Sequence, residues 1–161
     1  MSLINHLSST NDCPLWYFIV LIISVPFLYF ITKKSIVSFL FPYVFLIIGE
    51  TLIFRTVSIE PDYEFELFWS YKEWGKYWFE ITANIVAFIP LGFMLYKLCG
   101  RKGILFAFLF STGIECIQLA AHRGLFELDD IFNNVLGTII GCITYIIFKE
   151  IKKRKLKGKI A

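Results

Sequence analysis

Five apolar runs, separated by short polar or charged breaks, dominate this sequence. Each run contains 18 or 19 residues, which is long enough for an α-helix to cross the roughly 30 Å hydrocarbon core of a bilayer. The pattern therefore predicts an all-α fold, a polytopic membrane bundle of five transmembrane helices. The predicted helices are Leu15–Thr32, Ile36–Phe54, Ile81–Cys99, Gly103–Ala121 and Ile131–Phe148. They divide the chain into an N-terminal helix with its turn (1–35), a membrane domain (36–148) and a basic tail (149–161).

The composition agrees with a membrane protein. Hydrophobic residues make up 57% of the 161 residues and charged residues only 18%, with a mean hydropathy of +0.67. A soluble domain of this size could not bury so much apolar surface. The four cysteines show no paired spacing, so the sequence predicts neither a disulfide framework nor a zinc site, and it indicates no cofactor.

The positive charges predict an orientation. Lys33 and Lys34, then Arg101 and Lys102, and finally the basic tail mark alternate connections. By the positive-inside rule these connections are cytoplasmic, which places the N-terminus outside and the C-terminus inside. The first fourteen residues lack the Lys or Arg of a signal-peptide n-region, so we expect the first helix to be retained.

The connection Arg55–Glu80 is the one long segment between the predicted helices. It is rich in Glu and in Trp, Tyr and Phe, which favour the boundary between water and lipid. We expect a short amphipathic stretch on the outer surface of the membrane. It is interpreted either as an ordinary aromatic belt or as a lid over a site.

Polar residues gather where the fourth and fifth predicted helices join. Ionisable groups near hydrocarbon cost roughly 2.5–3.5 kcal/mol each on insertion scales, so a group of them at one depth predicts a functional site. The residues predicted to bind a ligand are Asn84, Glu115, Gln118, Arg123, Asp129, Asp130 and Asn134. Four others, predicted to support them, are Glu50, Arg55, Glu127 and Asn133.

Purely structural roles compete with this interpretation. Asp129 and Asp130 could cap a helix, and Glu115 and Gln118 could serve only as hydrogen bonds between helices. Glu115 is expected either to pair with an arginine or to be protonated by burial.

Helical spacing places Ser111, Glu115, Gln118 and His122 on one stripe of the fourth helix. A second stripe, on the fifth helix, is predicted to face it or to share a cavity with it. Its members are Asp130, Asn133, Asn134, Gly137, Gly141 and Thr144.

Three residues are predicted to shape helix packing. Gly137 and Gly141 form a small-xxx-small pair that lets a neighbouring backbone approach closely. Pro90 is expected to kink the third helix, because proline removes a backbone hydrogen bond.

An ordered set of short motifs resembles the VanZ-like family of bacterial membrane proteins over roughly residues 43–145. The motifs are Asn84-Ile85, Phe88-Ile89-Pro90-Leu91-Gly92-Phe93, Glu115-Cys-Ile-Gln118, the stretch Arg123 to Ile131, Asn134-Val-Leu-Gly137 and Gly141, preceded by the segment Glu66–Trp74. The resemblance implies a four-helix core in a bacterial plasma membrane, to which the first helix is an addition. It also implies a connection with teicoplanin resistance, the phenotype of the protein that names the family.

Two functions follow as hypotheses. The first is a non-catalytic protein whose outward-facing site binds a membrane lipid or a lipid-linked peptidoglycan precursor, with Arg123 on a phosphate. The alternative is a metal-dependent outer-leaflet enzyme in which Asp129, Asp130 and Glu115 act on a lipid headgroup. A transporter would require internal repeats, which the sequence lacks, and the basic tail beside a membrane helix does not indicate nucleic-acid binding.

Overall fold

Helices build almost the whole structure, a computed structural model that describes residues 14–57 and 62–157. This part of the chain contains five helices long and apolar enough to cross a membrane, so the predicted all-α membrane bundle is confirmed. The helices are α2 (Leu15–Thr32), α3 (Ser35–Ile48) with its π-helical continuation η1 (Gly49–Ile53), α4 (Trp69–Lys72), α5 (Trp74–Cys99), α6 (Lys102–Ala121) and α7 (Leu128–Lys157). Two short strands, β1 (Asp62–Glu64) and β2 (Leu125–Glu127), complete the fold.

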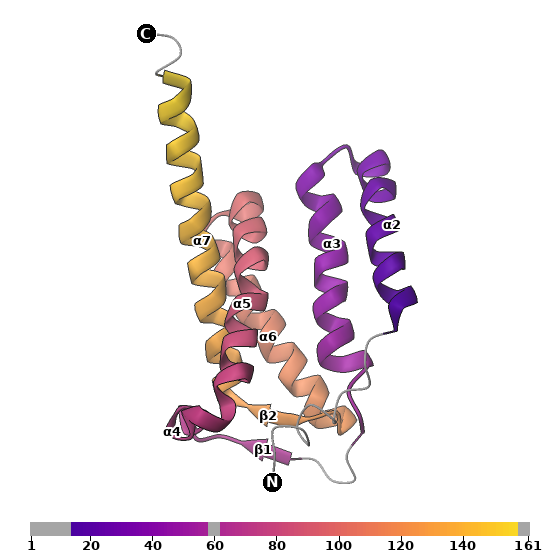
Figure 1. Cartoon of the computed structure of the whole chain (residues 1–161), viewed down its shortest axis with the longest axis vertical. Coiled ribbons are helices and arrows are strands. Elements are labelled where there is room, and N and C mark those ends of the chain that lie inside the picture. Colours follow the sequence, from indigo (N-terminus) through magenta and orange to yellow (C-terminus); the bar gives the residue numbers. More distant parts are fainter. Residues whose placement is uncertain (1–13, 58–61, 158–161) are drawn as a thin grey trace.

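The bundle has two distinct ends. In Figure 1, α2 and α3 form a hairpin beside α5, α6 and α7, and the two strands lie at the end where α6 finishes and α7 begins. We call this the strand end. At the opposite end α7 projects past its neighbours, because its 30 residues give a helix of about 45 Å. This projecting part carries the lysines of the predicted basic tail as far as Lys157.

Two of the predicted helices are longer than their apolar runs. The third begins at Trp74 rather than Ile81, and the fifth runs from Leu128 to Lys157 rather than from Ile131 to Phe148. Backbone hydrogen bonds do not require apolar side chains, so both helices continue into polar sequence. Helix α5 also runs unbroken through Pro90, whose side chain is exposed.

The strands are a feature that the apolar pattern did not predict. β1 pairs with β2 in parallel, with Tyr63 opposite Phe126. A parallel pair needs a long crossover connection, which here is the helical hairpin of α5 and α6. The connection expected as an amphipathic surface stretch is therefore built differently: it forms β1, α4 and the first turns of α5. Glu60 of that connection lies outside the described residues.

The closest packing in the bundle joins α5 to α7. A Cβ atom added to Gly137 would lie 2.1 Å from the carbonyl oxygen of Ile85, and one added to Gly141 would lie 2.1 Å from that of Ile89. Both glycines therefore let the backbones of the two helices touch. Further into the bundle, Phe88 and Leu91 of α5 form an apolar core with Ile47 of α3 and Ile114 of α6.

Helix α2 lies at the edge of the bundle and packs mainly on α3. Tyr17 is its buried residue, and the Tyr17 hydroxyl donates a hydrogen bond to the carbonyl oxygen of Phe45. Most of its large apolar side chains are exposed, which suits a helix surrounded by hydrocarbon.

Candidate functional site

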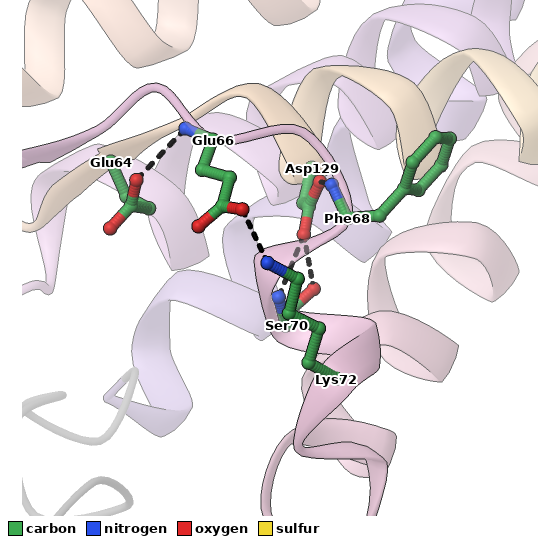
Figure 2. Close-up of polar contacts among 6 residues, drawn as sticks. All are labelled: Glu64, Glu66, Phe68, Ser70, Lys72 and Asp129. Carbon is green, nitrogen blue, oxygen red and sulfur yellow. Dashed lines mark hydrogen bonds and ion pairs between the residues drawn. The ribbon is translucent and has the colours of Figure 1, made fainter.

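Asp129 anchors the segment that precedes α5 to the start of α7. Its carboxylate is fully buried and accepts three hydrogen bonds, as Figure 2 shows. Oδ1 accepts from the Phe68 backbone N–H, while Oδ2 accepts from the Ser70 N–H at 3.0 Å and from the Ser70 hydroxyl at 2.5 Å. The carboxylate thus holds the turn that leads into α4, where Phe68 adopts a left-handed conformation with φ of 67°. A non-glycine residue pays roughly 1–2 kcal/mol for that conformation, so the turn needs such support.

Tyr71 adds a second connection between α4 and α7. Its hydroxyl donates to Oδ1 of Asn133, and its ring packs edge-on against the ring of Phe68. Burial, followed by the negative charge of Asp129, raises the pKa of the Tyr71 phenol above its usual value. The phenol therefore stays protonated and remains a donor to Asn133.

A buried polar stripe runs along α6 toward the strand end. Ser111, Glu115 and Gln118 are each at most 2% exposed. Ser111 Oγ accepts from Asn134 Nδ2 of α7 at 2.8 Å, and Glu115 Oε2 accepts from the Glu127 backbone N–H at 3.0 Å. Gln118 Nε2 donates to the carbonyl oxygen of Thr51 in η1 at 2.9 Å. The stripe therefore connects α6 to α7, β2 and η1.

Arg123 caps the carbonyl end of η1. Its Nη1 donates to the carbonyl oxygens of Leu52, Ile53 and Arg55, at 3.1, 2.8 and 3.0 Å. The last carbonyls of a helix have no partner within the helix, and a cation beside them also complements the helix dipole. This arrangement gives Arg123 a structural task in addition to the phosphate contact predicted for it.

Three carboxyl groups from three elements interact with Arg55, and a fourth, from Glu80, interacts with two of those three; we call these five residues the acidic cluster. Its members are Glu80 of α5, Glu115 of α6, Glu127 of β2, Asp130 of α7 and Arg55 itself. Asn84 of α5 joins them, since its Nδ2 donates to Asp130 Oδ1 at 2.6 Å. The members other than Glu115 are partly exposed, so the cluster reaches the surface at the strand end.

Burial and the neighbouring carboxyl groups change the pKa of Glu127. Burial raises the pKa of its carboxyl group from 4.5 to about 9, and the charges of Asp130, Glu80 and Glu115 act in the same direction, whereas Arg55 opposes them. Near neutral pH the Glu127 side chain therefore holds a proton, which reduces the repulsion among the carboxylates.

The raised pKa of Glu127 predicts how stability depends on pH. Between pH 4.5 and 9 the unfolded chain has lost this proton and the folded chain keeps it, so the free energy of unfolding falls as the pH rises. In Glu127→Gln this contribution disappears. We expect the variant to match wild type near pH 5 and to exceed it by roughly 1–3 kcal/mol near pH 8.5, because the other acids share the titration. Thermal unfolding across this range measures the difference.

Glu73→Gln is the matched control for this prediction, since the Glu73 side chain is 63% exposed and lies in a surface ion pair with Lys76. Its stability should follow that of wild type at every pH. Parallel pH profiles for Glu127→Gln and wild type would contradict the assigned pKa.

The structure brings together most of the residues that the sequence pattern selected. Asn84, Glu115, Asp130, Arg55 and Glu127 meet in or beside the acidic cluster. Gln118, Arg123, Asp129, Asn133 and Asn134 lie around it and hold the neighbouring elements. Glu50 is exposed on η1. Among the described residues, no group of three His, Cys, Asp or Glu side chains could hold a metal ion.

The residues of the stripe predicted on α7 do not face one common partner but contact several different elements. Asn134 faces Ser111 of α6, Asn133 faces Tyr71 of α4, and Gly137 faces α5. Thr144 is exposed. Neighbouring residues on a helix point about 100° apart, so Asn133 and Asn134 cannot share one face.

Sequence reasoning missed four contributors to this site: Thr51, Ser70, Tyr71 and Glu80. Thr51 acts through its backbone carbonyl, for which a sequence carries no signal. Ser70 and Tyr71 lie within the Glu66–Trp74 segment that resembles the family, and that resemblance was the signal available for them.

Comparison with known proteins places these features in a family context. The chain is similar to the family whose model is described as VanZ/LLP1, over residues 15–149. This match begins at the first spanning helix, so the expectation that this helix lies outside the family region was wrong. Neither the curated proteins nor the solved structures contain a match to the chain.

Proposed function

The chain belongs to the VanZ/LLP1 family, and from this premise we propose that it is a bacterial plasma-membrane protein that binds a lipid or a lipid-linked cell-wall intermediate at its strand end. The observation that carries the proposal is a set of buried polar side-chain atoms without a hydrogen-bond partner in the described part of the chain. They include Gln118 Oε1, Asn133 Nδ2 and Asn134 Oδ1. Each such atom costs free energy in an apolar bundle, so a ligand that pairs with them would recover that cost.

The proposed orientation puts the strand end outside the cell. Arg101, Lys102 and the lysine-rich projection of α7 lie at the opposite end of the bundle, which the positive-inside rule assigns to the cytoplasm. An outward-facing site of this kind has access to lipid-linked precursors on the surface where glycopeptide antibiotics act. Occupation or masking of such a precursor would lower susceptibility to teicoplanin-type lipoglycopeptides.

Expression in a susceptible Gram-positive host tests this function. Wild type, Asp130→Asn, Glu115→Gln and the exposed control Glu73→Gln are produced at matched membrane levels. We expect wild type and Glu73→Gln to raise the inhibitory concentration of teicoplanin several-fold and to reduce the binding of labelled antibiotic to cells. Both cluster variants should lose the effect, because each removes a carboxyl group from the acidic cluster. Equal susceptibility of cells with wild type and with empty vector would refute the resistance function.

A further inference from the structure

An apolar groove lies on the outside of the bundle between α3–η1 and α6. It has a volume of about 270 Å³. Its lining is Ile48, Leu52, Leu109, Phe110, Gly113, Ile114 and Ile117. All of these residues belong to spanning helices, so the medium that meets the groove is hydrocarbon. An acyl chain of a lipid is the occupant whose chemistry fits such walls.

The groove ends beside the polar site. Leu52 lines the groove, and its carbonyl oxygen accepts the hydrogen bond from Arg123. Ile117 also lines it and precedes Gln118, whose amide crosses to the carbonyl of Thr51. On α6 the groove residues and the polar stripe therefore occupy neighbouring faces. A lipid with its chain in the groove would present its headgroup to the strand end.

The charges at the strand end determine which headgroup charge can bind there. Among the described residues, the acidic cluster sets four carboxyl groups, of which Glu127 holds a proton near neutral pH, against the guanidinium of Arg55. Arg123 uses its Nη1 group on three backbone carbonyls of the protein. An anionic headgroup would meet repulsion from the carboxylates, whereas a cation would relieve their mutual repulsion.

Two orphaned acceptors point to a ligand that donates hydrogen bonds. Gln118 is 2% exposed and Asn134 is 5% exposed, and neither Gln118 Oε1 nor Asn134 Oδ1 has a donor in the described part of the chain. Gln118 lies one helical turn from Glu115, and Asn134 lies one turn from Asp130. Both amides therefore lie beside the acidic cluster. Their oxygens lack hydrogen-bond donors, and a primary ammonium group supplies N–H donors that carry a positive charge.

We infer that the ligand is a lipid whose headgroup carries a primary ammonium group, with its acyl chain in the groove between α3–η1 and α6 and its ammonium at the acidic cluster. This inference rests on the proposed lipid-binding function and specifies the class of lipid. A quaternary ammonium has the positive charge but no N–H donors, and a glycerol headgroup has O–H donors but no positive charge, so these two headgroups separate the contributions of charge and of hydrogen bonding.

The test is lipid retention by the purified full-length protein, measured by native mass spectrometry with one lipid at a time. The probes share dioleoyl chains and differ in headgroup: phosphatidylethanolamine, phosphatidylcholine and phosphatidylglycerol. We expect phosphatidylethanolamine to be retained about tenfold more strongly than the other two, since only its headgroup donates N–H hydrogen bonds from a positively charged group. Asp130→Asn should abolish this preference, and Glu73→Gln should leave it unchanged.

Gly113→Leu tests the groove, and Gly75→Leu is its matched control. A Cβ atom added at either glycine meets nothing within 4 Å, so neither backbone position excludes a side chain, and thermal unfolding of both variants checks that they fold. Gly113 lines the groove and Gly75 lies in the first turn of α5. We expect Gly113→Leu to lower retention of all three lipids about tenfold and Gly75→Leu to leave it unchanged.

The possible outcomes distinguish a failure of the ammonium inference from a failure of the lipid-binding function. Retention that Gly113→Leu weakens, but that is equal for the three headgroups or greatest for phosphatidylglycerol, would overturn the ammonium inference and leave the lipid-binding function standing. Retention that neither Gly113→Leu nor Asp130→Asn changes would overturn both.

Discussion

Replacing Gly137 by alanine is expected to lower the melting temperature of the purified protein by roughly 6–12 °C, which corresponds to about 3 kcal/mol for a chain of this size. The reason is the contact between α5 and α7. The added methyl group would lie 2.1 Å from the carbonyl oxygen of Ile85 and 2.9 Å from its carbonyl carbon. Both are backbone atoms inside a helix, so they cannot rotate away as a side chain would, and the helices must separate. Thermal unfolding in detergent measures the change.

The same substitution at Gly75 serves as the control, because Gly75 lies in α5, the helix that Gly137 of α7 contacts, but its Cβ would meet nothing within 4 Å. Alanine favours a helix over glycine by about 0.5–1 kcal/mol, so Gly75→Ala should be neutral or slightly stabilising. The two variants are thus expected to shift the melting temperature in different directions. A Gly137→Ala protein as stable as Gly75→Ala would show that the bundle does not depend on this close approach.

The membrane bundle could be predicted because a spanning helix leaves a strong pattern in the sequence. A run of 18 apolar residues rarely forms anything but a spanning helix, and the runs ending in Thr32, Cys99 and Ala121 stop where the observed helices stop. The errors lie at the polar ends of α5 and α7, since those ends are helical without being apolar. The strand pair was missed because three-residue strands that pair across two helices leave no local pattern.

The candidate site could be predicted as a set of residues but not as a set of contacts. Spacing alone placed Ser111, Glu115 and Gln118 on one face of α6, and the structure buries all three. The partners of Asp129 lie 59 and 61 residues away, in a turn that burial and periodicity do not reveal. The capping of η1 by Arg123 depends on backbone carbonyls, which every residue possesses. Identifying such contacts requires the fold itself.

The second large effect is expected at Asp129, whose replacement by alanine should release the segment that leads into α4. The variant leaves the Phe68 and Ser70 N–H groups without their acceptor, and the buried Ser70 hydroxyl loses its partner as well. Hydrogen bonds to a charged group contribute about 1.5–3 kcal/mol each, and the left-handed turn at Phe68 loses its support, so we expect a loss of roughly 2–3 kcal/mol after local relaxation.

Hydrogen exchange distinguishes this local release from general unfolding. In Asp129→Ala the amides of Phe68 and Ser70 should exchange at least tenfold faster, while the amides in the middle of α5 and α7 keep their protection, because the glycine contacts between those helices are untouched.

Two further variants serve as controls. Asp129→Asn retains one side-chain oxygen that can accept a hydrogen bond, so it should show an intermediate effect. Glu66→Gln replaces an exposed acid that pairs with Lys72 in the same segment, and it should show no effect. Unchanged exchange at Phe68 and Ser70 in Asp129→Ala would mean that the turn is held by its ring contacts, such as Phe68 with Phe132, and not by the carboxylate. The exchange rates therefore show whether Asp129 holds the segment that leads into α4 or whether, as the sequence alone suggested, its charge is available for a ligand.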